Sequence, residues 1–470
     1  MSKASAEETT FARPWLARYP EGVRWDQPFR AQPLHRLLVD AAARYPDNRY
    51  LDFHGRVFTY REVHDLVRRA AVGFQALGVG KGVRVGLFLP NCPQFVICYY
   101  AILKAGGTVV NFSPLYSVPE LIAQVEDSGT EIMVTLDVAM LLDKMEAVLT
   151  ASRLRQLVIG TLAEVLPFPK NVLYPIFQRR QQRHYDRNTA HLGFADLIAN
   201  DGAVRAVTID PDTDVAVLQY TGGTTGVPKG AMLSHANLYV NALQAVHYDP
   251  RAVPGIDRVL GALPLFHVFA MTVVLNVATY LGAEIVLMPK FELEQAMRLI
   301  ARRRITLLPG VPTMYTAMVN HERLVRYDLS SIRLSISGGA PLPVELKQRF
   351  EELTGAALCE GYGLTEASGV VAVNPYYGEQ KAASVGMPVP GTTIVITDHE
   401  VPDKILAQGE TGEICIIGPQ VMLGYWNRPE ESLDVLHAGR LRTGDIGYLD
   451  ADGYLFIVDR KKDLIKVGGF

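Results

Sequence analysis

Tyr220-Thr-Gly-Gly-Thr-Thr-Gly-Val-Pro-Lys-Gly230 is a glycine- and threonine-rich segment with the composition of a polyphosphate-binding loop. Glycines let the backbone approach a ligand and turn its N–H groups outward. Threonine hydroxyls add donors, and the lysine adds a mobile positive charge. The residues expected to contact phosphate are Thr221, Gly222, Gly223, Thr224, Thr225, Gly226 and Lys229.

The flanks of this loop fit the same interpretation. An apolar run at 214–218 predicts a buried strand, and Ser234 is a plausible N-cap for a helix that follows. Strand, glycine-rich loop and helix together favour an anionic ligand. The plain alternative is a Gly/Thr-rich surface turn. The loop is not a Walker A motif, because Gly230 follows the lysine where that motif has Ser or Thr.

Length and composition indicate a globular enzyme of several units. The chain has 470 residues, 49% hydrophobic and 20% charged, which is enough for two to four domain-sized units. Its net charge of −3 gives no case for nucleic acid. Four scattered cysteines predict reduced core thiols and neither a disulfide framework nor a zinc site, as in a cytoplasmic protein.

No segment reads as a membrane span or signal peptide. The polar residues 1–10 lack an apolar core. The most apolar stretch, 270–288, contains Asn276, Gly282 and Glu284, so a buried helix followed by a buried strand explains it better.

The pattern of predicted helices and strands divides the chain into an α/β part and a β-rich part. Helices alternate with apolar strands over 33–150 and again over 214–388, which predicts two doubly wound α/β subdomains with parallel sheets. Short strands with turns after Gly391 predict a small β-rich subdomain, a distorted β-barrel. The expected domains are 1–206, 207–390 and 391–461, with a hinge and the start of a further domain at 462–470.

Residues 161–206 interrupt the alternation of helices and strands in the first α/β subdomain, which predicts an insertion. Residues 168–177 are aromatic and proline-interrupted, and four arginines follow by position 187. One interpretation is peripheral contact with a membrane surface through 168–187, at the inner face of a membrane. The favoured interpretation is a surface connector whose aromatic residues pack on the domain.

Four further segments accompany the loop. They are Ser337-Gly-Gly-Ala-Pro-Leu342, Glu360-Gly-Tyr-Gly-Leu-Thr-Glu366, Thr443-Gly-Asp445 and Asp459-Arg-Lys-Lys-Asp463. Each alone is weak: a Gly-Gly-Ala-Pro run could be any turn, and a charge run is usually solvated.

Together and in this order, the segments resemble the AMP-forming adenylate superfamily, which includes acyl-CoA synthetases, adenylation domains of non-ribosomal peptide synthetases, and luciferases. The resemblance begins near Phe58-Thr-Tyr-Arg-Glu62 and covers nearly all of the chain. The phosphate loop and Leu263-Pro-Leu-Phe-His-Val-Phe269 are most similar to bacterial long-chain fatty acyl-CoA ligases. Arg13-Pro-Trp15 and Leu166-Pro-Phe-Pro169 point the same way.

The resemblance implies a reaction in which a carboxylate joins the α-phosphorus of ATP, pyrophosphate leaves, and CoA then takes the acyl group. The implied catalytic residues are Lys229, His267, Thr365 and Glu366, with Thr221 and Glu366 holding Mg²⁺ through oxygen ligands. Tyr362 and the 338–341 backbone would enclose adenine, and Asp445 would bind the ribose hydroxyls. The implied nucleotide-binding residues are Gly338, Gly339, Ala340, Pro341, Glu360, Gly361, Tyr362, Gly363, Thr365, Asp445, Arg460, Lys462 and Lys466.

An apolar tunnel is expected on the substrate side. Its walls would come from His267, Val268, Phe269, Met271, Thr272, Gly310, Val311 and Pro312. His267 is either a hydrogen-bonded core residue or, as the resemblance implies, a neighbour of the acyl carboxylate and the CoA path. Each buried CH₂ contributes roughly 0.8 kcal/mol, so such a tunnel would favour long chains.

The sequence ends at Val467-Gly-Gly-Phe470, where family members continue into a small α+β domain. The resemblance places Lys462 at the hinge and the adenylating lysine beyond the end. The expectation is therefore a chain that binds nucleotide and fatty acid but ligates poorly. Alternatives left open are a fatty acyl-AMP ligase acting on a carrier protein, an aryl- or dicarboxylate-CoA ligase, a non-catalytic binding module, and a homodimer.

Overall fold

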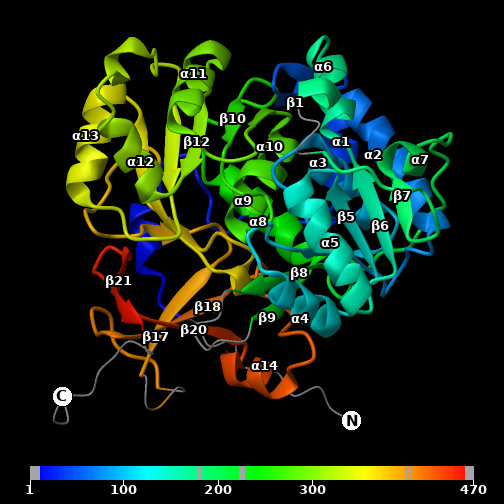
Figure 1. Cartoon of the computed structure of the whole chain (residues 1–470). Helices are drawn as coiled ribbons and strands as arrows, with labels where there is room; N and C mark the ends of the chain where they lie inside the picture. The colour runs from blue at the N-terminus through cyan, green and yellow to red at the C-terminus, as the bar shows by residue number, and fades with distance from the viewer. Residues whose placement is uncertain (1–10, 178–181, 222–227, 399–400, 402–403, 461–470) are drawn as a thin grey trace, which may run out of the picture.

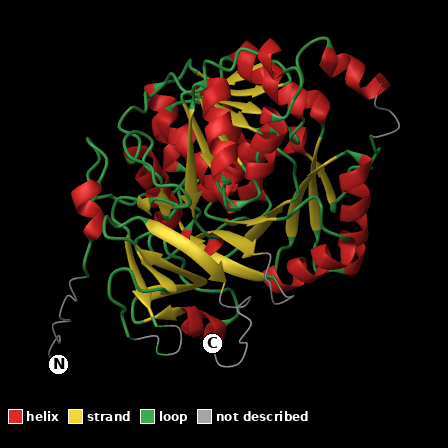
Figure 2. Ribbon diagram, turned by 90° about the vertical axis from the view of Figure 1, so that its left-hand side faces the viewer, coloured by secondary structure: helices red, strands yellow, loops and turns green. Residues whose placement is uncertain are grey.

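The computed structural model describes residues 11–177, 182–221, 228–398, 401 and 404–460 (Figure 1). Strands in these ranges form three sheets, of seven, nine and five strands. The two larger sheets belong to two α/β halves that lie side by side, and the antiparallel sheet lies beneath them. Figure 2 shows the same layering from the side, with helices covering the upper sheets. The predicted α/β class with an added β-rich unit is confirmed.

The seven-stranded sheet has the order β7–β6–β5–β3–β4–β8–β9 and is parallel except for β9. Strands β4 and β5 are buried at every residue, as expected for a sheet covered on both faces. Its strands are β3 (Arg84–Leu87), β4 (Thr108–Asn111), β5 (Ile132–Leu136), β6 (Gln156–Gly160), β7 (His191–Gly193), β8 (Val215–Thr221) and β9 (Lys229–Ser234).

The nine-stranded sheet has the order β16–β15–β14–β13–β12–β10–β11–β1–β2. Its central strands are parallel, and antiparallel strands close both edges. Its strands are β1 (Arg49–Phe53), β2 (Arg56–Thr59), β10 (Arg258–Gly261), β11 (Glu284–Leu287), β12 (Leu307–Gly310), β13 (Leu334–Ser337), β14 (Ala357–Tyr362), β15 (Ala372–Val373) and β16 (Met387–Pro388).

The five-stranded sheet is antiparallel and consists of β17 (Thr393–Thr397), β18 (Gly412–Ile417), β19 (Leu436–His437), β20 (Arg440–Leu449) and β21 (Leu455–Arg460). The short strands and turns predicted after Gly391 correspond to this sheet. The first half of β20 carries polar residues and pairs with both β18 and β19.

Helices fill the space between and around the sheets. Helix α3 is buried from Pro93 to Leu103, and its Tyr100 hydroxyl donates to Asn276 Oδ1 at 3.0 Å in the other α/β half. The helices are η1 (Pro14–Arg18), α1 (Arg36–Arg44), α2 (Tyr60–Ala76), α3 (Pro93–Lys104), α4 (Val118–Ser128), α5 (Ala139–Ala151), η2 (Leu162–Val165), α6 (Lys170–Phe177), α7 (Phe194–Leu197), α8 (His235–His247), α9 (Val268–Ala270), η3 (Met271–Asn276), α10 (Val277–Leu281), α11 (Leu293–Arg303), α12 (Pro312–Val319), η4 (Leu324–Arg326), α13 (Val344–Thr354), η5 (Thr365–Ala367) and α14 (Pro429–Val435).

Strand pairing crosses the predicted boundary at 206/207. The β1–β2 hairpin joins the nine-stranded sheet through the pairing of β1 with β11. Strands β8 and β9 join the seven-stranded sheet through the pairing of β4 with β8. The boundaries themselves stay a prediction, but each α/β half receives strands from both sides of position 206.

The simple strand–loop–helix picture of the phosphate loop is wrong in one respect. An antiparallel strand, β9, lies between the loop and α8, and it pairs with β8 from Thr221↔Lys229 to Val215↔Ser234. The cap prediction is confirmed, because Asn237 N–H donates to Ser234 Oγ at 3.1 Å. Thr221 and Lys229, which flank the loop, are thus held opposite each other.

Residues 161–206 are partly integrated into the fold. Strand β7 extends the seven-stranded sheet, and Tyr174 and Tyr185 pack against the core. Around α6, however, Phe168 is 82% exposed and Val172 is 57% exposed. Among the described residues, every helix is too short or too polar to cross a bilayer.

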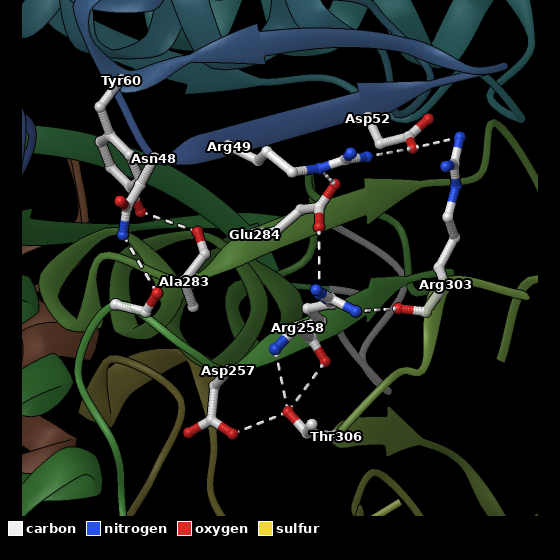
Figure 3. Close-up of polar contacts among 11 residues, drawn as sticks. Asn48, Arg49, Asp52, Tyr60, Asp257, Arg258, Ala283, Glu284, Arg303 and Thr306 are labelled. Carbon is white, nitrogen blue, oxygen red and sulfur yellow. Dashed lines mark hydrogen bonds and ion pairs between the residues drawn. The ribbon is translucent and has the colours of Figure 1, made fainter. Parts of the chain in front are cut away.

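A network of buried carboxylates and arginines ties the β1–β2 hairpin to the amino-terminal ends of β10 and β11 (Figure 3). Glu284 accepts from Arg49 Nε at 2.7 Å and pairs with Arg258 Nε at 3.4 Å. Asp52 pairs with Arg303 at 2.7 Å and with Arg49 at 3.2 Å. Because Glu284 and Asp52 are almost fully buried, their charges depend on these partners.

Replacing Glu284 with alanine should lower the free energy of unfolding by about 1.5–3 kcal/mol, because Arg49 and Arg258 each lose a charge-assisted contact. Chemical denaturation would measure the change. The matched control is Asp47→Ala, which breaks an exposed pair with Arg61 and should cost less than about 1 kcal/mol. Equal losses in the two variants would contradict the role of the network.

Candidate active site

A cavity of about 420 Å³ lies along β12 and β13, from their carboxyl ends to their amino ends, and meets β14 at its carboxyl end. At one end it is lined by Gly338, Gly339, Tyr362, Gly363 and Thr365. Beyond these residues the lining is almost entirely apolar. One cavity thus joins the predicted nucleotide segments to the predicted acyl segments, although they are far apart in sequence.

Glycine residues, which have no side chain, shape the polar end of the cavity. A Cβ on Gly363 would lie 1.9 Å from the Gly369 carbonyl oxygen, so only glycine fits there. A Cβ on Gly338 would lie 3.2 Å from the Phe269 ring, which is tighter than ordinary packing. Close packing thus favours glycine at both positions, and the backbone of Gly338, Gly339 and Gly363 lines this end of the cavity, here called the glycine-rich surface.

The turn after β13 is fixed by Glu360 and does not itself line the cavity beyond Gly339. The Leu342 N–H donates to Glu360 Oε1 at 3.0 Å, while Ala340 and Pro341 are exposed. Burial raises the pKa of Glu360 to about 7. Glu360 therefore holds the turn in place in this structure.

Tyr362 and Asp445 meet directly, as the resemblance implied that their segments would. The Tyr362 hydroxyl donates to Asp445 Oδ2 at 2.6 Å, across 83 positions of sequence. Asp445 lies on β20, where its N–H donates to Thr443 Oγ1 at 3.0 Å and its backbone is in register with Arg460. The Asp445 carboxylate is thus fixed beside the glycine-rich surface.

Glu366, Thr221 and Lys229 lie on neighbouring elements. Glu366 is on η5, which contacts both β8 and β9. Its Oε1 accepts from the Tyr425 hydroxyl at 2.7 Å. Thr221 ends β8, and its hydroxyl donates to the Lys229 carbonyl at 3.5 Å across the hairpin. The Lys229 ammonium pairs with Glu431 and lies 5.2 Å from the Tyr425 ring centroid.

Part of the predicted nucleotide set falls outside the described residues. These residues are Gly222, Gly223, Thr224, Thr225, Gly226, Lys462 and Lys466. The Arg460 backbone belongs to β21.

The apolar wall comes from the helical stretch 268–281 and from β12. The stretch contains a π-helical segment, and Phe269, Val273, Val277 and Leu281 line the cavity at a spacing of four, which places them on one face. His267, Val268 and Val311 line it as predicted.

Four of the predicted wall residues do not line the cavity. Thr272 donates to the Ser368 carbonyl at 2.6 Å, and Met271 Sδ accepts from Asn111 at 3.5 Å, because both lie on another face of the helix. Gly310 packs against the Tyr315 ring, where a Cβ would lie at 2.9 Å. Pro312 is the first residue of α12.

His267 lies at the start of α9, where the polar end meets the apolar wall. Its ring reaches the cavity and lies 4.7 Å from the Phe266 ring centroid. The apolar surroundings lower the pKa of His267, so the neutral imidazole is favoured near pH 7.

Comparison with known proteins agrees with this geometry. The AMP-binding enzyme family matches residues 38–426. The chain belongs to the AMP-binding enzyme family. A long-chain-fatty-acid–CoA ligase of Bacillus subtilis (strain 168) is 44% identical over 462 residues, with 97% of this chain and 82% of the relative covered.

Solved AMP-binding enzymes share the fold. ATP-bound MatB from Rhodopseudomonas palustris has a TM-score of 0.81 and 30% identity, covering 94% of this chain and 81% of that chain. A long-chain-fatty-acid-CoA ligase from Archaeoglobus fulgidus has a TM-score of 0.81 and 25% identity, covering 94% and 87%.

A polar cluster beside the hairpin was not predicted from the sequence. Asp127 accepts from Tyr220 at 2.6 Å and from Arg428 at 3.0 Å, and its carbonyl accepts from Trp426 at 3.0 Å. Tyr425 adjoins this cluster, because its carbonyl accepts from the Arg428 N–H at 3.3 Å. The available signal was the aromatic pair 425–426 flanked by glycine and proline, a composition that is typical of a structured turn in this AMP-binding enzyme.

The raised pKa of Glu360 gives a pH prediction. Its folded-state pKa, about 7, lies above the ordinary 4.5, so its contribution to stability is full below pH 4.5 and is lost as pH rises through 7. Glu360→Gln keeps an acceptor for Leu342 but cannot ionise. We expect the free energy of unfolding of this variant to match that of wild type near pH 4 and to exceed it by about 1–2 kcal/mol at pH 8.

Urea denaturation of ligand-free protein at the two pH values would measure the difference. The control is Glu352→Gln, an exposed carboxylate on α13. A pH-independent difference for Glu360→Gln would contradict the assignment.

Proposed function

We propose that this chain activates a long-chain fatty acid with ATP, giving acyl-AMP and pyrophosphate, and that the acyl group is then transferred to CoA with release of AMP. The observation that carries the proposal is the continuous cavity. Its polar end brings together Gly338, Tyr362 and Thr365, and its apolar part runs the length of β12 and β13. The 44% identity to a ligase named for this reaction supports the choice.

In the first step a carboxylate oxygen forms a bond to the α-phosphorus, and the bond from that phosphorus to the oxygen bridging to the β-phosphate breaks. No proton has to move, so the site must hold two anions in line and screen their charges. The 338–341 backbone and Tyr362 would hold adenine, and Asp445 would accept hydrogen bonds from the ribose. The hydroxyl of Thr365, at the cavity's polar end, would donate to the α-phosphate.

Mg²⁺ fits the residues beside the hairpin. The described residues contain no cluster of three or more His, Cys, Asp or Glu side chains placed for a metal ion. Glu366 and the Thr221 hydroxyl would supply two oxygen ligands, with water and substrate phosphates completing the shell, which is the usual arrangement for this ion. When bound, the ion neutralises phosphate charge. Lys229 would close on the phosphates from the other end of the hairpin.

The cavity favours an alkyl chain over a second charged group. Its wall is formed by residues such as Val273, Val277 and Leu281, and Asp249 is the one formally charged side chain among the described lining residues. A dicarboxylate would place a second anion near this carboxylate, which opposes it. The neutral imidazole of His267 can hydrogen-bond the acyl carboxylate without a full charge.

CoA remains the proposed acceptor, and a carrier-protein thiol is the alternative. Peripheral membrane contact through 168–187, a cytoplasmic location and a homodimer also stay predictions. Exposed Phe168 and Val172 support membrane contact. Against it, Arg183 and Arg187 already pair with Asp143 and Asp196, each at 2.9 Å.

Asp445→Ala should weaken ATP binding about ten- to a hundredfold, because a charge-assisted hydrogen bond contributes roughly 1.5–3 kcal/mol. Fatty-acid binding should not change. Calorimetric titration with ATP and with a long-chain acid would test both. Tyr362→Phe is the control for the lost Tyr362–Asp445 bond and should weaken ATP binding less. Unchanged ATP affinity in Asp445→Ala would refute the ribose assignment.

Tyr425→Phe removes the hydroxyl that orients Glu366 but keeps the ring beside Lys229. We expect the Mg²⁺ concentration that half-maximally strengthens ATP binding to rise about tenfold, as is typical when a group behind a metal ligand is lost. ATP binding without Mg²⁺ should stay as in wild type. Tyr448→Phe, on a ring that stacks on Phe456, is the control. An unchanged Mg²⁺ requirement would show that Glu366 does not depend on Tyr425.

A further inference from the structure

The end of the cavity opposite the glycine-rich surface has an unusual lining. Most residues there are apolar, among them Ala252, Leu281, Leu307 and Leu334. Asp249, two residues after the end of α8, also lines this end and is only 9% exposed. A carboxylate at the bottom of an apolar cavity needs compensation from partners.

Arg333 supplies that compensation and is itself held from three sides. Its guanidinium pairs with Asp249 at 2.7 Å and with Asp257 at 2.9 Å, and it donates to the Tyr377 hydroxyl at 2.9 Å. Asp257 in turn accepts from Thr306 at 2.7 Å and so connects to the network of Figure 3.

The Asp249 side chain is also fixed by its own loop. Its Oδ1 accepts from the Arg251 N–H at 3.0 Å, and its carbonyl accepts from the Ala252 N–H at 3.2 Å. Two partners therefore hold the carboxylate, one from the loop and one from the start of β13. A group anchored at both oxygens resists displacement by an apolar chain end.

The Asp249–Arg333 pair and the glycine-rich surface lie at opposite ends of β13, so their separation gives the length of the cavity. Arg333 directly precedes β13, and Gly338 directly follows it. Five residue steps along an extended strand correspond to about 16 Å. The ion pair thus lies one strand length from the surface assigned to the nucleotide.

We propose that the Asp249–Arg333 ion pair is the floor of the acyl cavity and sets the longest chain that binds with full affinity. This inference rests on the proposed function, since it requires the acid's alkyl chain to occupy the cavity. Up to the floor, each methylene leaves water for an apolar wall. A methylene that reached the floor would have to displace or desolvate the paired charges, and it would add no affinity.

The test is equilibrium binding of a homologous series of saturated fatty acids, measured by displacement of a fluorescent fatty acid. In wild type the affinity should rise about fourfold per methylene and then stop rising at a limiting length. Asp249→Ala should move that limit to longer chains. The first acid beyond the wild-type limit should bind the variant at least about fourfold more tightly than wild type. Arg333 keeps Asp257 and Tyr377 as partners in this variant.

Two further variants distinguish a change at the end of the cavity from a general loss of stability. Ala252→Leu fills the same end and should move the limit to shorter chains. Asp257→Asn removes the other carboxylate of Arg333 without touching the cavity lining, so it should lower the melting temperature and leave the limit unchanged. The inference is overturned if Asp249→Ala keeps the wild-type limit, or if Asp257→Asn moves that limit as far as Asp249→Ala does. Failure of wild type to bind any acid would overturn the proposed function as well.

Discussion

The close approach of Gly363 to Gly369 is the constraint on which the rest of the site depends. With a Cβ 1.9 Å from the Gly369 carbonyl oxygen, any other residue at 363 would force this turn apart. The turn directs Tyr362 to Asp445 on β20 and Glu366 to Tyr425. One tight turn after β14 therefore joins the nine-stranded sheet to the five-stranded sheet and to the polar cluster beside β9.

The same turn also anchors the wall of the cavity. The Ser368 carbonyl accepts from Thr272 at 2.6 Å, and the Val370 N–H donates to Asn241 Oδ1 at 3.0 Å on α8. The helical stretch 268–281 and α8 are thus tied to the segment that carries Tyr362 and Thr365. Because both walls share one anchor, the polar and apolar parts of the cavity keep a fixed relation.

Local sequence signals predicted most individual elements, because they depend on neighbouring residues. The cap at Ser234, the strand predicted at 214–218 and the helix followed by a strand within 270–288 are examples. Pairing between distant strands could not be predicted in this way. Nothing near residues 49–59 indicates that β1 pairs with β11, or that β9 would intervene before α8.

The site residues also divide into those with a local sequence signal and those that depend on contacts between distant segments. Glycine positions and the Tyr362 and Asp445 segments were found because their composition is unusual, and their meeting was expected from the resemblance. Asp127 escaped notice because an isolated aspartate carries no local signal. The aromatic pair at 425–426 indicates a turn, but nothing near it indicates the contact with Glu366. Met271 and Thr272 were misplaced because a helix turns them away from the face that holds Phe269.

The Lys229 side chain is positioned by an ion pair that is weak enough to exchange. Its ammonium pairs with Glu431, and both side chains are partly exposed, at 26% and 37%. Pairs of this exposure are worth less than about 1 kcal/mol, so an incoming polyphosphate competes easily for the lysine. Glu431 is not left alone by that exchange, because Arg428 lies 3.6 Å away. Arg428 in turn keeps its bond to Asp127, which also holds Tyr220 at the start of the hairpin. Release of Lys229 from Glu431 therefore has little energetic cost, as the proposed phosphate contact requires.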